Sequence, residues 1–230
     1  MRLLDLFTGT GSVRVVAEAL GYEVTSLDID PRCNPDFVAD ITLFDYTVWS
    51  PGEFDVVWTS PPCLYFSAAR RSNLGRMVKG EIMTKETLLR DTEMHGLPVL
   101  RRTQEIIEYL KPTVWIIENP YTGTMKDYIT EHPAVYDYCM FGKLYRKRTA
   151  IWSNKLLRDV KCDGTHLVEG RHPMTAIGTS KTQQGQGGGS NKTGRYSIPH
   201  DLVQHILVSV PGTQRWGVVL CIYPAVLDHL

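Results

Sequence analysis

The sequence predicts an α/β fold in which a mainly parallel sheet is covered by helices on both faces. Two observations support this prediction. Short apolar stretches that end in polar or turn residues alternate with stretches of helical spacing, as in successive β-α-β units. The chain has 230 residues, of which 43% are apolar and 22% charged, so it is long enough to form one substantial core.

The expected elements follow one another along the first two thirds of the chain. Strands are predicted at residues 3–7, 23–29, 37–41, 54–59 and 114–117, with a later pair at 138–141 and 149–152. Helices are predicted at 13–20 and at 97–110, where Lys111-Pro112 ends the second one. Residues 64–96 are expected to form a loop, and residues 178–194, rich in Gly, Gln, Ser and Thr, a loop or a disordered segment.

Composition narrows the class of protein and its surroundings. Lys plus Arg and Asp plus Glu number 25 each, so any charge that binds nucleic acid must be local. The N-terminal apolar stretch is too short for a signal peptide, and no apolar run reaches about eighteen residues, so no membrane association is expected. Five scattered cysteines do not resemble a disulfide framework, which predicts an intracellular, reducing location.

A glycine turn follows the first predicted strand, in the sequence DLFTGTGS at residues 5–12. Gly9 and Gly11 let the backbone approach a ligand at the start of the next helix, although a plain tight turn has the same pattern. Asp28 ends the second strand about twenty residues later, where a carboxylate can bind ribose hydroxyls or simply face solvent. Asp40 ends the third strand and could accept from an adenine amino group. Together these strand ends indicate a cofactor that contains adenosine.

Cys63 follows two prolines directly after the strand predicted at 54–59. The prolines fix their own φ angles and keep each preceding residue out of the helical region, so the thiol is held at the carboxyl end of the strand. Ligands bind at that edge in open α/β sheets. From the residues alone, a buried structural cysteine after a turn is the alternative.

The motifs DLFTGTGS, SLDID, VADI, TSPPC and IIENP resemble, in order and spacing, those of the cytosine-5 methyltransferase family. The resemblance continues through YRKRTAIW at 145–152 and, more faintly, RYSIPHDLVQHI at 195–206. It implies a Rossmann-like methyltransferase fold, with one domain at 1–210 and a C-terminal tail of unassigned role at 211–230. It also implies that S-adenosyl-L-methionine is the cofactor and binds at Phe7, Gly9, Gly11, Asp28, Ile29, Asp40, Ile41 and Pro61.

The same resemblance assigns the catalytic residues. Cys63 would be the nucleophile that adds to carbon 6 of a flipped cytosine, after which carbon 5 takes the methyl group. Glu118 follows a buried strand and would place its carboxyl against ring nitrogen 3, although an acid that caps a turn is the alternative. Arg146 and Arg148 occupy the positions of the family's Arg-x-Arg pair and are candidates for assisting the thiol.

Several positions depart from the family pattern. Leu144 stands where a glutamine is expected, and Pro120 follows Glu-Asn in place of the more usual valine. Arg195 and Tyr196 stand where a Gly-Asn pair is expected. The large target-recognition segment of the family is reduced to residues 155–185. A protein partner or self-association is therefore a candidate source of target recognition.

Two basic segments flank the proposed site, at residues 64–96 and 143–158. A phosphate backbone could run between them, although a charge run is more often a solvated face. Cys162, His166 and His172 could bind zinc, but their spacing matches no established zinc signature, and we expect no metal there.

Three functions remain open from the sequence. The leading one is a minimal DNA cytosine-5 methyltransferase, with DNA as its partner. The second is an RNA methyltransferase of the same fold, for example one that acts on tRNA. The third is a nucleic-acid-binding module that has lost turnover. The presence of Cys63 and Glu118 argues against the third, whereas the reduced recognition segment argues for it.

Overall fold

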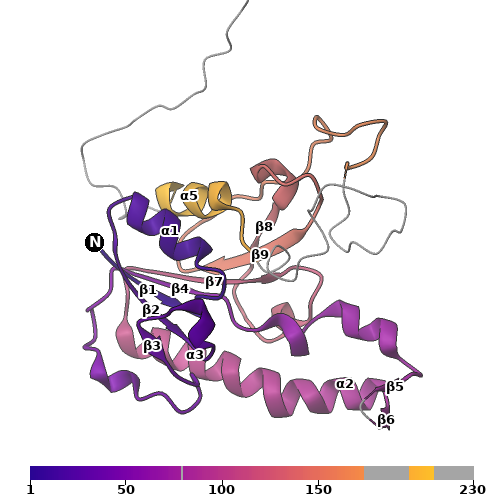
Figure 1. Cartoon of the computed structure of the whole chain (residues 1–230), viewed down its shortest axis with the longest axis horizontal. Helices are drawn as coiled ribbons and strands as arrows, with labels where there is room; N and C mark the ends of the chain where they lie inside the picture. The colour runs from indigo at the N-terminus through magenta and orange to yellow at the C-terminus, as the bar shows by residue number, and fades with distance from the viewer. Residues whose placement is uncertain (79, 174–196, 210–230) are drawn as a thin grey trace, which may run out of the picture.

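A seven-stranded sheet, in the order β3-β2-β1-β4-β7-β9-β8, forms the centre of the protein in a computed structural model that describes residues 1–78, 80–173 and 197–209 (Figure 1). The strands are β1 (Arg2–Leu6), β2 (Glu23–Asp28), β3 (Phe37–Val38), β4 (Val56–Thr59), β7 (Val114–Pro120), β8 (Ala134–Asp137) and β9 (Arg148–Ser153). The first five of these pair in parallel, and β9 and β8 are antiparallel additions at one edge. The predicted mainly parallel α/β sheet is confirmed.

Helices cover both faces of this sheet (Figure 1). α1 (Ser12–Ala19) and α5 (His200–Ser209) pack together on one face, and α3 (Leu97–Leu110) lies on the other. Successive strand residues point to opposite faces, so Leu3 of β1 joins the core under α1 and α5 while Leu4 joins the core under α3. This alternation explains why the strands are apolar on both sides.

The segment predicted as a loop at 64–96 contains regular structure. A hairpin of β5 (Met77–Val78) and β6 (Glu81–Ile82) precedes α2 (Lys85–Asp91), which continues through a π-helical turn, η5 (Thr92–Gly96), into α3. Thr84 caps α2, because its hydroxyl accepts from the Thr87 amide at 3.1 Å. Short 3₁₀ turns complete the described chain: η1 (Pro31–Cys33), η2 (Tyr46–Val48), η3 (Cys63–Tyr65), η4 (Ala68–Asn73), η6 (Met125–Asp127) and η7 (Tyr138–Phe141).

One strand prediction is wrong in position, and another is too long. Residues 138–141 form the buried turn η7. The strand that pairs with β9 is β8, which ends directly before η7. A short apolar run does not distinguish a strand from a buried helical turn, and Gly142, with φ of 77°, closes this one as a turn. The strand predicted at 37–41 ends at Val38, and Asp40 then closes a turn by accepting from Thr42. Helix α5 was not predicted.

The order of the strands creates a switch point beside β1. The chain runs from β1 to β2 and β3 on one side, and then crosses to β4 and β7 on the other. The connections that leave β1 and β4 at their carboxyl ends therefore diverge, which opens a crevice where ligands bind in such sheets. Residues 178–194 and the tail 211–230 lie outside the described residues. Within the described ranges, every helix is too short or too polar to cross a membrane.

Candidate active site

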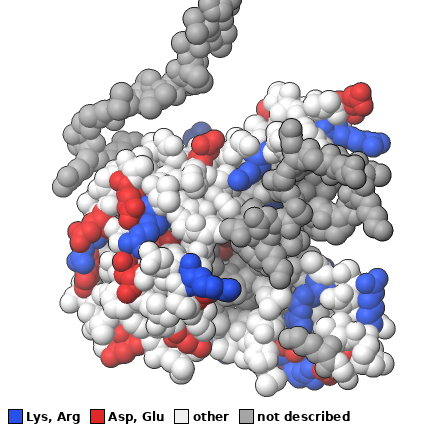
Figure 2. Space-filling model, viewed as in Figure 1, with Lys and Arg blue, Asp and Glu red and all other residues white. Residues whose placement is uncertain are grey.

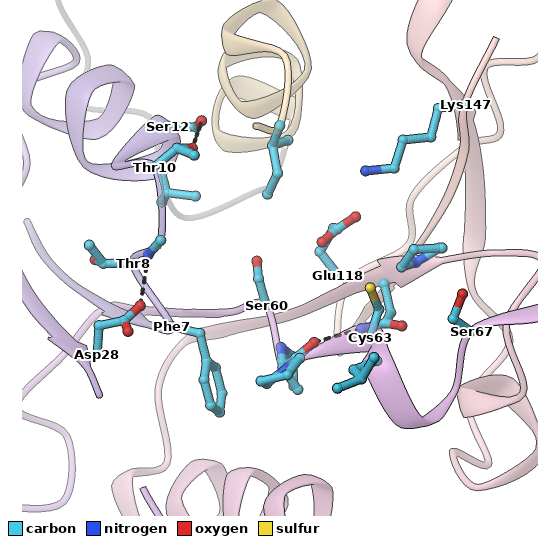
Figure 3. Close-up of a pocket in the computed structure, with 18 of the residues that line it drawn as sticks. Phe7, Thr8, Thr10, Ser12, Asp28, Ser60, Cys63, Ser67, Glu118 and Lys147 are labelled. Atoms are coloured by element: carbon cyan, nitrogen blue, oxygen red, sulfur yellow. Dashed lines mark hydrogen bonds between the residues drawn. The ribbon is translucent and has the colours of Figure 1, made fainter. Parts of the chain in front are cut away.

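A pocket with a volume of about 620 Å³ lies at the carboxyl ends of β1, β2, β4 and β7 (Figure 3). Each strand contributes residues that follow it or lie near its end. Phe7 and Gly9 follow β1, Asp28 ends β2, Cys63 comes after β4, and Glu118 lies near the end of β7. The volume lies within the range of about 300–1,000 Å³ that is usual for small-molecule sites.

The glycine turn forms one end of the pocket and is held by Asp28. Phe7, Gly9 and Gly11 have positive φ angles of 70°, 50° and 71°, which explains the two glycines. The Gly9 amide donates to one Asp28 carboxylate oxygen at 2.8 Å, and the Asp30 amide donates to the other at 2.9 Å. A carboxylate has about four acceptor positions, so Asp28 can still accept from two ribose hydroxyls. The geometry of this end fits the predicted adenosine.

Of the other residues predicted to bind the cofactor, some line the pocket and some lie outside it. Pro61 lines the pocket, whereas Gly11 lies just behind the lining at the start of α1. Ile29 is 65% exposed, and Ile41 is buried in the core under α3, so neither side chain reaches the pocket. Asp40 also lies outside it, because its carboxylate accepts from the amide and hydroxyl of Thr42. The adenine contact expected of Asp40 stays a prediction.

Asp5 is a pocket residue that the sequence did not single out. It lies near the end of β1 and is 1% exposed, and the Thr8 hydroxyl donates to it at 2.7 Å. The pKa of Asp5 is raised to about 7, chiefly by burial; the Thr8 hydrogen bond lowers it, and the nearby charge of Asp28 raises it. An acid in the middle of an apolar strand is the sequence signal that could have identified it.

Cys63 begins the turn η3 and faces the other end of the pocket (Figure 3). The double-proline turn before it is tied to β7, because the Asn119 side-chain amide donates to the Pro61 carbonyl at 2.8 Å. Burial raises the pKa of the Cys63 thiol, and the charge of Glu118 raises it further, whereas Lys147 lowers it. The thiol is therefore in a fixed position and depends on a cation to ionise.

Glu118 is buried at 7% exposure, and its carboxylate faces the same space as Cys63 (Figure 3). The Thr149 hydroxyl makes a short hydrogen bond to Glu118 Oε1, and the Tyr138 hydroxyl lies 3.5 Å from the same oxygen. Burial raises the pKa of Tyr138 well above its usual range, so Tyr138 keeps its proton and can donate it. One carboxylate oxygen is thus held by β9 and η7, which orients the group toward the pocket.

The predicted arginine pair lies outside the pocket, and the lysine between them lines it. Arg146 donates twice to the buried carboxylate of Asp137, at 3.1 Å each, and Arg148 Nε lies 3.5 Å from Asp137 Oδ1. Lys147 reaches the pocket instead (Figure 3). Residues that alternate along an extended segment point to opposite sides, so the two arginines face Asp137 and Lys147 faces Cys63. The structure thus brings Lys147 to the pocket and places both predicted arginines at Asp137.

The basic segment after Cys63 borders the pocket. Ser67, Arg70 and Asn73 line it, and Arg70 forms a short ion pair with Asp91. A second cavity of about 430 Å³ lies beside it, with Arg71 and Lys85 among its lining residues. On the face shown in Figure 2, Lys and Arg side chains gather over the segment around α2 and over the segment around β8 and β9. Positive charge thus borders the pocket on both sides.

The sheet order, the glycine turn at the switch point and the shared pocket define a Rossmann-like methyltransferase fold. A probable DNA (cytosine-5)-methyltransferase of Frog virus 3 (isolate Goorha) is 45% identical to the chain over 182 residues, which are 77% of this chain and 76% of the relative. The chain therefore belongs to the DNA (cytosine-5)-methyltransferase family. No protein-family model matches it.

Solved structures with a similar fold are more distant. A putative DNA modification methyltransferase encoded within an E. coli prophage has a TM-score of 0.44 at 13% identity, over 66% of this chain and 46% of that one. The Entamoeba histolytica methyltransferase EhMeth also has a TM-score of 0.44, at 16% identity, over 70% of this chain and 57% of that one. The chain thus spans about half the length of these two structures.

Proposed function

We propose that this protein transfers a methyl group from S-adenosyl-L-methionine to carbon 5 of cytosine in DNA, through a covalent adduct between Cys63 and carbon 6 of a flipped base. The observation on which this rests is that Cys63, Glu118 and Lys147 face one pocket whose other end is the glycine turn held by Asp28. Membership of the DNA (cytosine-5)-methyltransferase family supports the same reaction.

The chain's own residues divide the chemistry among them. Lys147 favours the thiolate of Cys63, which adds to carbon 6 and makes carbon 5 nucleophilic. Glu118, in its protonated form, donates a hydrogen bond to ring nitrogen 3, where negative charge develops during this addition. After methyl transfer, solvent water takes the carbon 5 proton, and the electrons of that C–H bond form the carbon 5–carbon 6 double bond as the thiolate of Cys63 leaves, which restores both the aromatic ring and the enzyme. Fixing Pro61 to Asn119 keeps the sulfur in register with the base.

The cofactor supplies an electrophilic methyl group when it is bound. We propose that Asp28 holds its ribose hydroxyls and that Phe7, Gly9 and Pro61 line its site, because these side chains and the turn already face the pocket. The fit is chemical as well as spatial: the oxygens of Asp28 are acceptors, and the positive-φ turn brings backbone close to the ligand.

Nucleoside analysis tests the reaction and the substrate together. The protein is incubated with methyl-labelled donor and either duplex DNA or tRNA, and the nucleic acid is digested for mass spectrometry. We expect label in 5-methyl-2′-deoxycytidine from DNA. Label only in the RNA nucleoside would overturn the substrate, and label in neither, with donor binding intact, would overturn the proposed enzyme activity.

Mechanism-based trapping tests the role of Cys63. With donor present, DNA that contains 5-fluorocytosine should give an adduct stable to denaturing electrophoresis, because fluorine replaces the proton that must leave. Cys63→Ser should abolish the adduct, since a serine hydroxyl is far less ionised than a thiol. Cys33→Ser, at a half-buried cysteine outside the pocket, is the matched control and should give the parent yield. An adduct that survives Cys63→Ser would show that another residue is the nucleophile.

A further inference from the structure

Four metal-binding side chains meet beside η7, away from the pocket. Cys139 of η7 is buried, and the half-buried Cys162, His166 and His172 come from the segment that follows β9. The sulfur atoms and ring nitrogens of the four residues all lie within 4.8 Å of one another. Cys162 Sγ lies 3.7 Å from His166 Nε2 and 3.5 Å from His172 Nε2.

The two sulfur–nitrogen distances around Cys162 match an edge of a zinc coordination tetrahedron. Zinc bonds of about 2.3 Å to sulfur and about 2.0–2.1 Å to nitrogen place neighbouring S and N ligands about 3.6 Å apart. The two measured sulfur–nitrogen distances, 3.5 and 3.7 Å, lie on either side of this value. Two thiolates also balance the charge of Zn²⁺, so a Cys₂His₂ set would bury no net charge.

We propose that Cys139, Cys162, His166 and His172 bind one Zn²⁺ ion in a closed structural site. All four positions of the tetrahedron are filled by protein, as in structural rather than catalytic zinc sites. The site goes beyond the proposed methyl transfer, because none of its residues lines the pocket.

The segment that supplies three of the ligands needs such an anchor. Up to Val160 the chain is attached to the sheet: Val160 bridges to Tyr136, and Val160 and Leu157 pack against the core under α1 and α5. Among residues 161–173, none belongs to either hydrophobic core. A segment with so little apolar burial cannot offset its loss of chain entropy, and a bound metal ion is a common substitute for a core.

The proposed site also borders the charge network behind the pocket. The Cys162 amide donates to Asp137 Oδ2 at 2.8 Å, and the same carboxylate binds Arg146 and Arg148. A zinc ion that fixes Cys162 would therefore fix a partner of Asp137, which holds the two arginines on either side of Lys147.

No metal was expected from the sequence because the spacing of Cys162, His166 and His172 matches no established zinc signature; these are also only three of the four ligands. Cys139 lies on the other side of β9 in the sequence, and the parallel bridge between Val160 and Tyr136 of β8 brings Cys162 to η7. The structure thus supplies the fourth ligand that the linear pattern lacked.

Metal analysis of the whole protein tests the proposal. Protein purified under reducing conditions without added zinc should contain about one zinc ion per chain, as measured by inductively coupled plasma mass spectrometry. Cys162→Ser and His172→Ala, both at half-buried positions, should each lower bound zinc at least about tenfold. Cys33→Ser and His132→Ala, which remove the same residue types outside the cluster, should keep the parent zinc content.

Proteolysis provides a second measurement that does not depend on activity. Removing zinc with a chelator should speed tryptic cleavage after the exposed residues Lys161 and Arg171, and adding zinc back should restore protection. Circular dichroism should show that the variants retain the sheet. A protein without zinc whose cleavage is unaffected by chelator would overturn the proposal. A Cys139–Cys162 disulfide, found by peptide mapping of protein purified under reducing conditions, would overturn it as well.

Discussion

At the scale of single residues, the reactivity of the site depends on the competition around Cys63. Burial and the neighbouring Glu118 both favour the neutral thiol, and Lys147 is the cation that opposes them. Lys147 is positioned over the ring of Tyr138 at 4.7 Å, so its approach to the pocket is defined by packing as well as by charge. Thiolate formation should therefore be sensitive to this one side chain.

We predict that Lys147→Met moves the pH dependence of covalent adduct formation to higher pH. Without the lysine charge, the pKa of Cys63 rises, so less of the thiol is ionised at neutral pH and adduct formation is slower there. A pKa higher by about 1 lowers the thiolate fraction about tenfold at any pH well below the pKa. The pH–rate profile with 5-fluorocytosine DNA is the measurement.

Lys143→Met is the matched control, because it removes the same charge from the same basic segment outside the pocket. Its profile should keep the parent midpoint even if DNA binding weakens. A Lys147→Met profile that changes only in height would assign the lysine to binding rather than to ionisation of the thiol.

At the scale of elements, β1 carries a carboxyl group into the interior. Its register places Asp5 beside Ser26 of β2 and Trp58 of β4, so the group is surrounded by sheet on both sides. The position at the switch point explains the burial: a strand that ends at a ligand crevice brings its last side chains to the pocket wall. The strand therefore includes an acid with a pKa of about 7.

We predict that Asp5→Asn makes the stability of the free protein less sensitive to pH. The folded-state pKa of about 7 lies above the ordinary value of 3.8, so the folded protein binds the proton more tightly than the unfolded chain does. Protonated Asp5 thus stabilises the folded protein. This stabilisation is fully present below about pH 4 and is lost as pH rises to about 7. Since a pKa difference of 1 corresponds to about 1.4 kcal/mol, the loss is on the order of a few kcal/mol.

Chemical denaturation of both proteins at pH 5 and pH 8 is the measurement. Asparagine keeps the shape of the side chain and an acceptor for the Thr8 hydroxyl. The difference in free energy of unfolding, variant minus parent, should therefore be more positive at pH 8 than at pH 5. Asp55→Asn, at a half-buried carboxylate outside the pocket, controls for the loss of one acid. An equal stability difference at both pH values would contradict the raised pKa.

At the scale of the whole molecule, neutral net charge conceals an uneven distribution. Basic residues border the pocket on the η4–α2 side and on the β9 side, although several are already paired. Arg70 binds Asp91, and Arg90 binds Glu81, so both are poorly placed to bind phosphates. The exposed Arg71, Arg76 and Lys85 are better candidates for contacts with a DNA backbone.

We predict that replacing Arg71, Arg76 and Lys85 together by glutamine flattens the salt dependence of DNA binding. Each lost phosphate contact should reduce the slope of log K against log salt by about 0.9, so the total change is up to about 2.7. Fluorescence anisotropy with a short duplex at several salt concentrations measures the slope.

The control variant replaces Arg32, Arg101 and Lys111 by glutamine, since these residues line neither cavity. Its slope should stay near the parent value. If both triple variants show the parent slope, the basic segment around α2 is a solvated face and DNA is bound elsewhere.

The sequence by itself determined the features that depend on near neighbours. Alternating strand and helix patterns predicted the parallel sheet, and the glycines predicted a turn between β1 and α1. The two prolines predicted that Cys63 would be held directly after β4. Backbone preferences and side-chain periodicity act over a few residues, so they can be read along the chain.

Tertiary structure decided which side chains share a site. Pairing of β8 with β9 places Arg148 opposite Asp137 and leaves Lys147 on the side of the pocket, and the bridge between Val160 and Tyr136 brings Cys162 to Cys139. The turn at Asp40 pairs its carboxylate with Thr42, while the switch point buries Asp5. These outcomes depend on contacts between segments far apart in the sequence, whose register and packing no local pattern specifies.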